Sequence, residues 1–540
     1  MLNPTPAQPA RKLKPAGANP DDMGVQNTPK QGATLAQALT AASWVTHAVT
    51  QGHSLTTALA DLEPWLPAAH STSALRGAVQ DLCFLTQRQL GRADALLFSL
   101  SKKPITQMDA GLLALMRVTM ALLCEPVAAG KTPRYDTHTV VDQAVRAVHA
   151  VLACRMTVWV NMLPQRPAKL VMNAAGKEMG NANTQAVAGF VNGVLRTYLR
   201  EQATRDKAAQ QTDSGQWNHP AWWVRRLQAD YPKHWQLLLA ANNVPAPMTL
   251  RANARVARVG TAAQAQAQLA AQGIESHMVA GCPNAVSLVK ALPVAQIPQF
   301  DAGWYSVQDA AAQVCVDLLD IQAGHRVLDA CAAPGGKTAH ILERHDVVLT
   351  AVDIAEARLN KVRASLVRIA PTLPKEIIKQ FTLHAADAAD LPAWWDGVPF
   401  DRVLLDAPCS ASGVVRRHPD VRWLRRESDL AVLMDSQTRL LDALWQTVAP
   451  NGLLLYVTCS VFKCEGEAQI EAFLQKTRTA KRLPCLGHTL YLPENIPDVQ
   501  AAVQTDSNPA QLQDAITQPS HTSVAQAKDG FYYALLRKLA

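Results

Sequence analysis

The chain has 540 residues, of which 48% are hydrophobic and 18% are charged, a composition typical of a globular protein with about three domains. The net charge of +8 fits a nucleic-acid partner, but many other proteins are equally basic, so charge alone does not decide this point. No stretch reaches the ~20 apolar residues of a membrane span, and the ten cysteines form no CxxC pair, so we expect a cytoplasmic protein without a bound metal or a disulfide framework.

The N-terminal part of the chain is predicted to be helical. Residues 1–33 are rich in Pro, Gly and Asn and lack the apolar core of a secretory signal, so we expect a disordered arm. Over 34–200 apolar residues recur at helical spacings, which predicts an all-α domain with an inserted loop over 150–183. The segments expected to form helices are 35–49, 74–90, 108–123 and 188–200.

The middle of the chain is predicted to join two larger domains. A polar stretch over 201–216 is a candidate linker. Residues 217–300 are predicted to form a helical connector, dense in Trp and Arg, followed by a small α+β module. We expect the tryptophans of the connector to pack between domains and not to stack on bases.

Residues 301–540 change to a rhythm of apolar strand, loop and helix. This alternation predicts a doubly wound, mainly parallel sheet covered on both faces, which is an α/β fold. The polar, Ala- and Gln-rich stretch over 487–528 is predicted to be a surface insertion. The candidate strands are RVLDA, VVLTAVD, FTLHAAD, RVLLDAP, GLLLYVTCS and GFYYALLRK.

The sequence VLDACAAPGGKTAHIL (327–342) places a strand, a glycine turn and a helix start in succession. Ligands of parallel sheets bind beyond the carboxyl ends of the strands, where glycines let the backbone approach and helix N–H groups face the ligand. The ending GGKT is similar to a phosphate loop, but that pattern needs a glycine where this chain has Cys331. The dinucleotide pattern G-x-G-x-x-G is also absent, so a triphosphate or dinucleotide site is not expected.

Acidic residues end the next three predicted strands. Asp353 follows Asp329 by 24 residues, which is close to the spacing of roughly 20 residues at which an acid binds the ribose of an adenosine cofactor. Asp387 and Asp406 end the two strands that follow. Aspartate is also a common turn residue, which remains the alternative for any one of them. An adenosine cofactor without a pyrophosphate, beside acids that favour a cation, predicts S-adenosylmethionine.

Two cysteines, each followed by serine, stand just past two predicted strands: Cys409 in LLDAPCSASG and Cys459 in LLLYVTCSVF. A thiolate is a strong nucleophile, and its addition to carbon 6 of cytosine makes carbon 5 able to accept a methyl group. An acid hydrogen-bonded to N3 of the base would stabilise the charge that develops during attack. Asp406 and the two cysteines have the side chains that this chemistry needs, although buried cysteines are also ordinary packing residues.

The motifs DACAAPGGKT, LLDAPCSASGVVRRHPDVRWLRR and LLLYVTCSVFKCEGE closely resemble the RsmB (Sun/Fmu) family of ribosomal RNA cytosine-5 methyltransferases, and the resemblance covers most of 30–480. The helices that include AGFVNGVLR resemble the NusB-like RNA-binding domain of that family. The resemblance implies a Rossmann-like, S-adenosylmethionine-dependent methyltransferase domain over 301–540. One departure is Gly466, which stands between two glutamates where the family often has Asn.

The resemblance also implies roles for single residues. Cys459 would be the nucleophile, Cys409 would assist release of the product, and Asp406 would contact the target base. DNA cytosine methyltransferases resemble the reverse case, with the nucleophile in the PC motif. The residues implied in cofactor binding are Cys331, Ala332, Ala333, Pro334, Gly335, Gly336, Lys337, Asp353, Asp387 and Asp406.

The run VVRRHPDVRWLRR (414–426) is strongly basic and contains Trp423. Because it follows Asp406 and Cys409 directly, we expect its guanidinium groups to contact the phosphates or bases of an RNA. The alternative is a solvated helix face. The residues predicted to bind RNA are Arg416, Arg417, His418, Arg422, Arg425 and Arg426.

These features predict a monomeric enzyme that methylates carbon 5 of a cytosine in small-subunit (16S) ribosomal RNA. A transfer-RNA or DNA cytosine-C5 methyltransferase is one alternative, and the NusB-like helices count against it. A catalytically inert RNA-binding factor of ribosome assembly is the other, and the complete set of acids and cysteines counts against it.

Overall fold

The structure is a computed structural model that describes residues 34–62, 73–101, 104–126, 132–153, 181–491 and 528–540. The arm predicted over 1–33 lies outside the described residues, as do most of the loop predicted over 150–183 and most of the insertion predicted over 487–528. In the described ranges, no helix is both long and apolar enough to cross a membrane.

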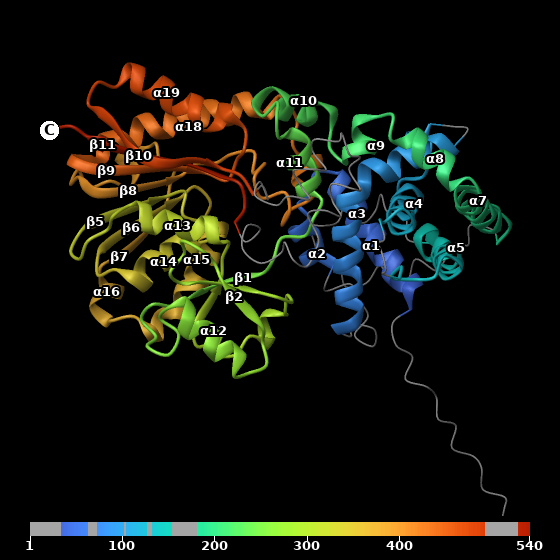
Figure 1. Cartoon of the computed structure of the whole chain (residues 1–540), viewed down its shortest axis with the longest axis horizontal. Helices are drawn as coiled ribbons and strands as arrows, with labels where there is room; N and C mark the ends of the chain where they lie inside the picture. Colours follow the sequence, from blue (N-terminus) through green and yellow to red (C-terminus); the bar gives the residue numbers. More distant parts are fainter. Residues whose placement is uncertain (1–33, 63–72, 102–103, 127–131, 154–180, 492–527) are drawn as a thin grey trace, which may run out of the picture.

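The N-terminal part of the chain forms an all-α domain, as predicted, at one end of the molecule (Figure 1). Its helices are α1 (Leu35–Thr50), α2 (Leu55–Leu62), α3 (Ser73–Leu100), α4 (Ala110–Leu123), α5 (Thr137–Ala153) and α7 (Asn181–Arg200). Thr34 and Gln37 cap the start of α1 reciprocally, and Asp109 caps α4. The helices bury one shared core of aliphatic side chains, and α2 and α5 fall outside the segments that the sequence predicted.

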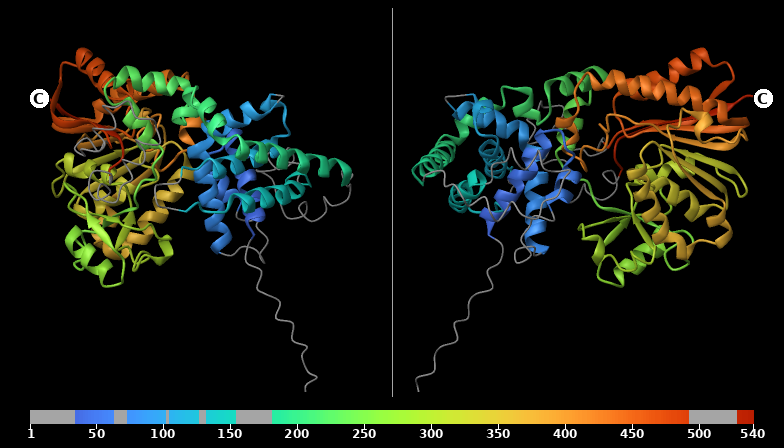
Figure 2. Two further views of the ribbon diagram at one scale, coloured as in Figure 1. Left: turned by 45° about the vertical axis from the view of Figure 1, so that its right-hand side comes forward. Right: turned by 180° about the vertical axis from the view of Figure 1, so that it is seen from behind.

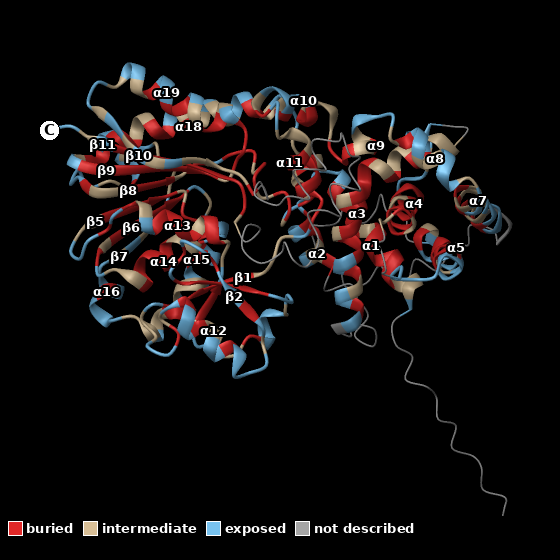
Figure 3. Ribbon diagram, in the orientation of Figure 1, coloured by how far each residue is buried: buried red, intermediate tan, exposed pale blue. Residues whose placement is uncertain are grey.

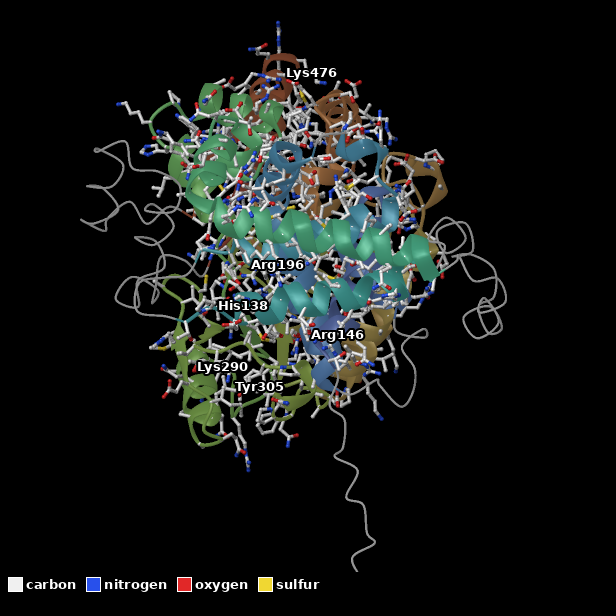
Figure 4. All side chains as sticks on the ribbon, turned by 90° about the vertical axis from the view of Figure 1, so that its right-hand side faces the viewer. His138, Arg146, Arg196, Lys290, Tyr305 and Lys476 are labelled. Atoms are coloured by element: carbon white, nitrogen blue, oxygen red, sulfur yellow. The ribbon has the colours of Figure 1, made fainter. Side chains whose placement is uncertain are left out.

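Helices α5 and α7 lie side by side on the outer side of this helical domain, which faces the viewer in Figure 4. Arg146 on α5 and Arg196 on α7 are exposed there. The opposite faces of the two helices bury residues such as Ala144 and Leu195 in the core. Both helices are therefore amphipathic, with a charged face toward solvent.

The stretch over 201–216 is not a free linker, in contrast to the prediction. It forms α8 (Gln202–Ala209) and α9 (Asp213–Trp217), which pack against α3. Arg92 of α3 pairs with Asp206 at 3.1 Å, and a Cβ added at Gly91 would lie 2.2 Å from the carbonyl oxygen of Ser214. These contacts make the stretch part of the helical domain.

The helical connector consists of α10 (Ala221–Asp230) and α11 (Trp235–Asn242), which lie between the helical domain and the large sheet (Figure 2). Trp223 is fully buried, and its ring centroid lies 5.0 Å from that of Phe462, which follows a strand of the large sheet. The two residues share a core cluster with Val415 and Tyr491. The prediction that the tryptophans pack between domains is confirmed.

The small α+β module contains β1 (Thr249–Ala252), α12 (Ala262–Ala270), β2 (Ser276–Met278), β3 (Ala285–Leu288) and β4 (Tyr305–Val307). Its four strands form an antiparallel sheet in the order β2-β3-β1-β4. Because β4 pairs with β1, this sheet extends past residue 300, where the sequence predicted the module to end.

The remaining part of the chain, from residue 310 to the C-terminus, forms the sheet domain. Its elements are α13 (Ala310–Leu318), β5 (Arg326–Ala330), α14 (Gly336–Arg344), β6 (Val348–Asp353), α15 (Glu356–Ile369), α16 (Lys375–Lys379), β7 (Phe381–Ala385), β8 (Phe400–Asp406), α17 (Val421–Leu424), α18 (Asp429–Thr447), β9 (Val448–Thr458), α19 (Glu467–Lys476), β10 (Ala480–Thr489) and β11 (Phe531–Lys538). The strands form one sheet in the order β10-β11-β9-β8-β5-β6-β7.

The sheet is mainly parallel and has helices on both faces, as predicted. Residues of α18 and α19 pack on one face and residues of α13 and α14 on the other. Strand β5 and the second half of β9, from Gly452 on, are almost entirely buried (Figure 3). The C-terminal strand β11 runs antiparallel to β9 and β10.

Strand β10 was not predicted, because its sequence AKRLPCLGHT is polar and contains Pro484. The strand lies at the edge of the sheet and has a register shift between Leu483 and Gly487. Edge strands tolerate proline because one side of the strand needs no ladder hydrogen bonds. The insertion predicted from residue 487 therefore begins inside a strand.

Candidate active site

The predicted site residues lie in loops at one edge of the large sheet. Parallel pairing of β5, β6, β7, β8 and β9 brings the carboxyl ends of these strands to the same edge. The glycine loop follows β5, Cys409 lies three residues after β8, and Cys459 follows β9 directly. The fold thus brings together two groups of residues that are distant in the sequence.

The glycine loop turns sharply from β5 into α14. Gly335 has a φ of 96°, and a Cβ there would lie 3.0 Å from the Cα of Val362. Both the positive φ and the close approach require glycine. Helix α14 begins at Gly336, so its free N–H groups point to the sheet edge.

The small module also supports the glycine loop. Arg251 of β1 is fully buried, pairs with Glu343 of α14 at 2.7 Å, and donates to the Gly336 carbonyl at 2.8 Å. Burial of a guanidinium is costly without such partners. The sequence analysis missed this contact, which fixes the start of α14 from outside the sheet domain.

The acids predicted to bind the cofactor lie around this loop. Asp353 is almost fully buried and accepts a hydrogen bond from the Ala333 N–H at 3.0 Å. Asp387 lies two residues past the end of β7 and pairs with Arg439 at 2.8 Å. Burial opposes its ionisation, but the hydrogen bond from the Ala389 N–H and the Arg439 guanidinium lower the pKa of Asp387.

Lys337 and Asp406 form an ion pair of 2.6 Å that joins the glycine loop to the end of β8. Burial would lower the pKa of Lys337, but the carboxylate of Asp406 outweighs this effect and raises it, and the Cys459 sulfur contributes in the same direction. The ammonium group is therefore held in its charged form beside both Asp406 and Cys459. Below the pair, burial raises the pKa of Asp329 to about 7.

These residues fit S-adenosylmethionine in their chemistry. The helix start and the small residues of the glycine loop leave backbone N–H groups for polar contacts of a ligand. The carboxylates at the ends of β6 and β8, Asp353 and Asp406, supply acceptor oxygens, and each also pairs with a cation of the protein: Arg358 at 3.2 Å and Lys337 at 2.6 Å. The loop has neither the phosphate-loop nor the dinucleotide glycine pattern, which agrees with a ligand that has no phosphate.

The two cysteines face each other across the ends of β8 and β9. Their Sγ atoms are 3.4 Å apart. Cys409 is only 8% exposed, whereas Cys459 is half-buried. The hydrogen bond to Cys459, burial and the negative charge of Glu465 all raise the pKa of the Cys409 thiol. Cys409 is therefore held as a neutral thiol that can donate to the Cys459 sulfur.

Beneath the cysteines lies a polar cluster that the sequence analysis did not predict. Ser410, Ser460 and Glu465 are all fully buried, and both serine hydroxyls donate to the Glu465 carboxylate. The repeated Cys-Ser pair was the sequence signal that could have pointed to this cluster. The partner of the two serines was not visible, because Glu465 lies beyond the second pair in the chain.

The basic run over 414–426, called here the junction segment, differs most from its prediction. Arg422 is fully buried and donates to the carbonyl oxygen of Asn242 at 2.8 Å. Arg416 is also buried, and its guanidinium lies 5.3 Å from the centroid of the Tyr491 ring. Neither guanidinium is placed to contact an RNA.

Arg417 of the junction segment pairs with Asp309 and with Asp529, both at 2.6 Å. Ion-pair partners of this kind offset the cost of taking a guanidinium out of water. The prediction that Arg416, Arg417 and Arg422 bind RNA therefore does not hold, because burial or ion pairs inside the protein occupy these side chains.

The junction segment also docks onto the helical domain. The indole N–H of Trp423 donates to the carbonyl oxygen of Gln87 in α3 at 2.8 Å. The backbone N–H of Leu55, at the start of α2, donates to the carboxylate of Asp420 at 2.8 Å. The segment therefore joins the helical domain, the connector and the sheet domain.

The RNA contacts expected of the other three residues stay predictions. His418 and Arg426 are exposed. Arg425 is half-buried, and its guanidinium donates to the carbonyl oxygens of Ser410 and Cys409 at 3.2 and 3.4 Å. Arg425 thus holds the loop that carries the first cysteine.

The sequence matches two described protein families. Residues 316–537 match the family described as 16S rRNA methyltransferase RsmB/F, and residues 219–295 match the ferredoxin-like domain of RsmF/B-like methyltransferases. A Vibrio cholerae protein named ribosomal RNA small subunit methyltransferase B is 36% identical over 501 residues, covering 92% of this chain and 96% of that protein. A Xanthomonas campestris protein of the same name is 37% identical over 511 residues, covering 94% of this chain and 98% of that protein.

A solved structure has a similar fold over nearly the whole chain. The crystal structure of a protein designated PH0851 superposes with a TM-score of 0.63 and covers 93% of this chain and 99% of its own. The two sequences are 19% identical, so the likeness concerns the fold. In the described residues, no group of three or more His, Cys, Asp or Glu side chains is placed to hold a metal ion.

Proposed function

The chain belongs to the RsmB/F family of 16S rRNA methyltransferases, and from this premise we propose that it methylates carbon 5 of a cytosine through a covalent adduct on Cys459. The family uses S-adenosylmethionine, which supplies an electrophilic methyl group on a cationic sulfonium. The proposed substrate is small-subunit ribosomal RNA, as the names of the relatives indicate for those proteins. The single observation that carries the choice of carbon 5 is the pair of cysteine thiols 3.4 Å apart beside Asp406.

In the proposed reaction the Cys459 thiolate adds to carbon 6 of the cytosine. Cys459 is the more exposed of the two cysteines, which supports its role as the group that meets the base. The Cys459 sulfur is one of the groups that raise the pKa of Lys337, so the Lys337 ammonium lies close enough to interact with it. Asp406 is placed next to Lys337 and is proposed to contact the target base, where the Lys337 ammonium offsets the negative charge that develops during attack.

The addition makes carbon 5 nucleophilic, and carbon 5 then takes the methyl group. The C5 proton then passes to water, the electron pair of the C5–H bond forms the C5–C6 double bond, and the C6–S bond breaks, which returns the Cys459 thiolate. Cys409 is proposed to assist this last step, because a neutral thiol 3.4 Å away can donate a hydrogen bond to the departing sulfur. The raised pKa of Cys409 supports this division of labour.

The residues proposed to hold the cofactor are those of the glycine loop and the acids around it. Asp353 is proposed to bind the ribose hydroxyls at the end of β6, where an acid does so in related sheets. Asp387 lies past the next strand and is proposed to bind the adenosine as well. The backbone of Cys331 to Lys337 then lines the approach to the methyl group.

The test is methyl transfer to RNA that carries no modification. Purified protein is incubated with labelled S-adenosylmethionine and with 16S rRNA transcripts, small ribosomal subunits or transfer RNA. We expect label in 5-methylcytidine from small-subunit RNA, and bisulfite sequencing of rRNA from a deletion strain to lose one signal. Label in another nucleoside, or in transfer RNA alone, would contradict the proposal.

A further inference from the structure

Each of the two cysteines is followed by a serine, and the two serine side chains meet at one carboxylate. Oε2 of Glu465 accepts hydrogen bonds from the hydroxyls of Ser410 and Ser460, the latter at 2.6 Å. Oε1 of the same carboxylate accepts from the backbone N–H of Ser410 at 2.8 Å. The residues next to Cys409 and Cys459 are therefore tied to a single side chain.

Further contacts extend this cluster through both loops. Oε1 of Glu465 also accepts from the side-chain amide of Gln437 at 3.2 Å, and this amide donates to the carbonyl oxygen of Pro408 at 2.9 Å. The hydroxyls of Ser412 and Ser460 are 2.9 Å apart. The loop after β8 and the loop after β9 are thus bonded to each other as well as to Glu465.

The carboxylate is fully buried, and the donors that reach it are neutral: one backbone N–H, two hydroxyls and one amide. Burial of a carboxylate is costly, and an apolar residue of similar size would fill the space with less penalty. A buried acid with four donors holds its neighbours in fixed directions, because each hydrogen bond restrains both angle and distance. The buried carboxylate therefore holds the loop after β8 and the loop after β9 in one fixed arrangement, and its hydrogen bonds offset part of the cost of its burial.

The backbone of Glu465 is itself fixed. The hydroxyl of Tyr456, near the end of β9, donates to the carbonyl oxygen of Glu465 at 2.9 Å. A Cβ added at the next residue, Gly466, would lie 2.7 Å from the rings of His488 and Tyr532. The glycine that departs from the family pattern lets this turn pack closely under the sheet.

We propose that Glu465 is a positioning residue for the methyl-transfer reaction, which sets the separation and direction of the Cys409 and Cys459 thiols through Ser410 and Ser460. This inference rests on the proposed function, because it assumes that Cys459 attacks the base and that Cys409 assists its release. Glu465 touches no reacting atom; it acts through the two serines. Arg425 restrains the Cys409 loop through its carbonyl oxygens.

The first test replaces Glu465 with Gln, which keeps the size of the side chain but puts a donor where one acceptor oxygen stood. Misplacement of a reacting group by about 1 Å costs roughly 100-fold in rate, so we expect kcat to fall by about that factor. KM for S-adenosylmethionine should stay within about twofold of the value for the unchanged protein, because the glycine loop after β5 lies apart from the two cysteine loops at the sheet edge. The matched control is Glu471→Gln, at an exposed glutamate on α19, and it should retain full activity.

The second test separates the two loops, and it serves if Glu465→Gln does not fold. Ser460→Ala should slow formation of the RNA adduct in a single turnover, because this serine follows the nucleophile. Ser410→Ala should form the adduct at the normal rate and release it slowly. Because all three residues act through one carboxylate, the effect of each serine variant should nearly vanish when it is added to Glu465→Gln.

Two outcomes overturn the inference. The first is full activity of Glu465→Gln. The second is a fall in kcat that is accompanied by weaker cofactor binding and by a lower melting temperature, because a merely structural role would lower all three. The proposed function is judged separately by Cys459→Ala. If Cys459→Ala is inactive and Glu465→Gln is fully active, only the positioning role fails; if Cys459→Ala is active, the covalent mechanism itself fails.

Discussion

The loops after β8 and β9 begin alike and end in different environments. Each carries a cysteine followed by a serine, and both serines bond the same carboxylate. Cys409 is buried and its pKa is raised, whereas Cys459 is half-buried and lies near the Lys337 ammonium. The same Cys-Ser dipeptide therefore stands in two different environments.

The difference shows that the environment of a cysteine is set by its neighbours in space and not by its motif. The Cys459 sulfur, burial and Glu465 raise the pKa of Cys409, whereas Cys459 lies closer to solvent and to the Lys337 ammonium. The strand order makes this difference possible, because β8 and β9 are adjacent and parallel and so present their ends side by side. Three predictions test whether the two cysteines differ in function and whether the cofactor loop acts separately from them.

The largest effect is expected for Cys459→Ala, which removes the proposed nucleophile. Methyl transfer should fall by about 10⁴-fold or more, the scale expected for loss of a covalent nucleophile. No RNA adduct should survive denaturing electrophoresis, while calorimetry should show unchanged cofactor binding. Cys464→Ala, at a packing cysteine nearby, is the matched control. Activity in Cys459→Ala would remove the distinction between the two loops.

Cys409→Ala should have a smaller and different effect. Attack and one methyl transfer should proceed, and the enzyme should then stall as a protein–RNA adduct, because no neutral thiol assists the departing sulfur. The adduct should be visible by denaturing electrophoresis and absent in the Cys409→Ala/Cys459→Ala double variant. An adduct found in Cys459→Ala in place of Cys409→Ala would show that the two roles are exchanged.

The smallest effect is expected at the cofactor loop, away from both cysteines. Asp353→Ala removes the proposed acceptor for the ribose hydroxyls and the partner of the Ala333 N–H. A hydrogen bond to a charged group contributes ~1.5–3 kcal/mol, so affinity for S-adenosylmethionine should fall roughly tenfold or more by calorimetry. Asp442→Ala, at an exposed ion pair with Lys476, is the control. Unchanged affinity in a folded Asp353→Ala protein would contradict the assignment.

Much of the fold could be predicted because its signals are local. The buried strands of the large sheet are continuous apolar runs, and the turn at Gly335 needs a residue that tolerates a positive φ. The acids and cysteines could be assigned to one edge because parallel strands share the direction of their ends. Strand β10 was missed because an edge strand with a proline has no such pattern.

The contacts that could not be predicted depend on direction in space. A run of arginines has the same charge whether it faces RNA or the interior of the protein. Arg417 is held inside by its ion pairs with Asp309 and Asp529, which are far away in the sequence. The same holds for Glu465, whose partner Ser410 is 55 residues away. Sequence spacing therefore pointed to the candidate reacting groups but not to the groups that hold them.

The junction segment has a consequence for how this protein can vary. Its side chains reach the helical domain through Trp423, the connector through Arg422 and the end of the chain through Arg417. The same segment begins a few residues after Cys409, and its Arg425 donates to the carbonyl oxygen of Cys409. The domains are therefore joined by side-chain contacts and not only by the chain that connects them. Replacing the helical domain would remove the partners of Trp423 and Asp420 in this segment, so an engineered domain exchange has to redesign the segment beside the candidate active site as well.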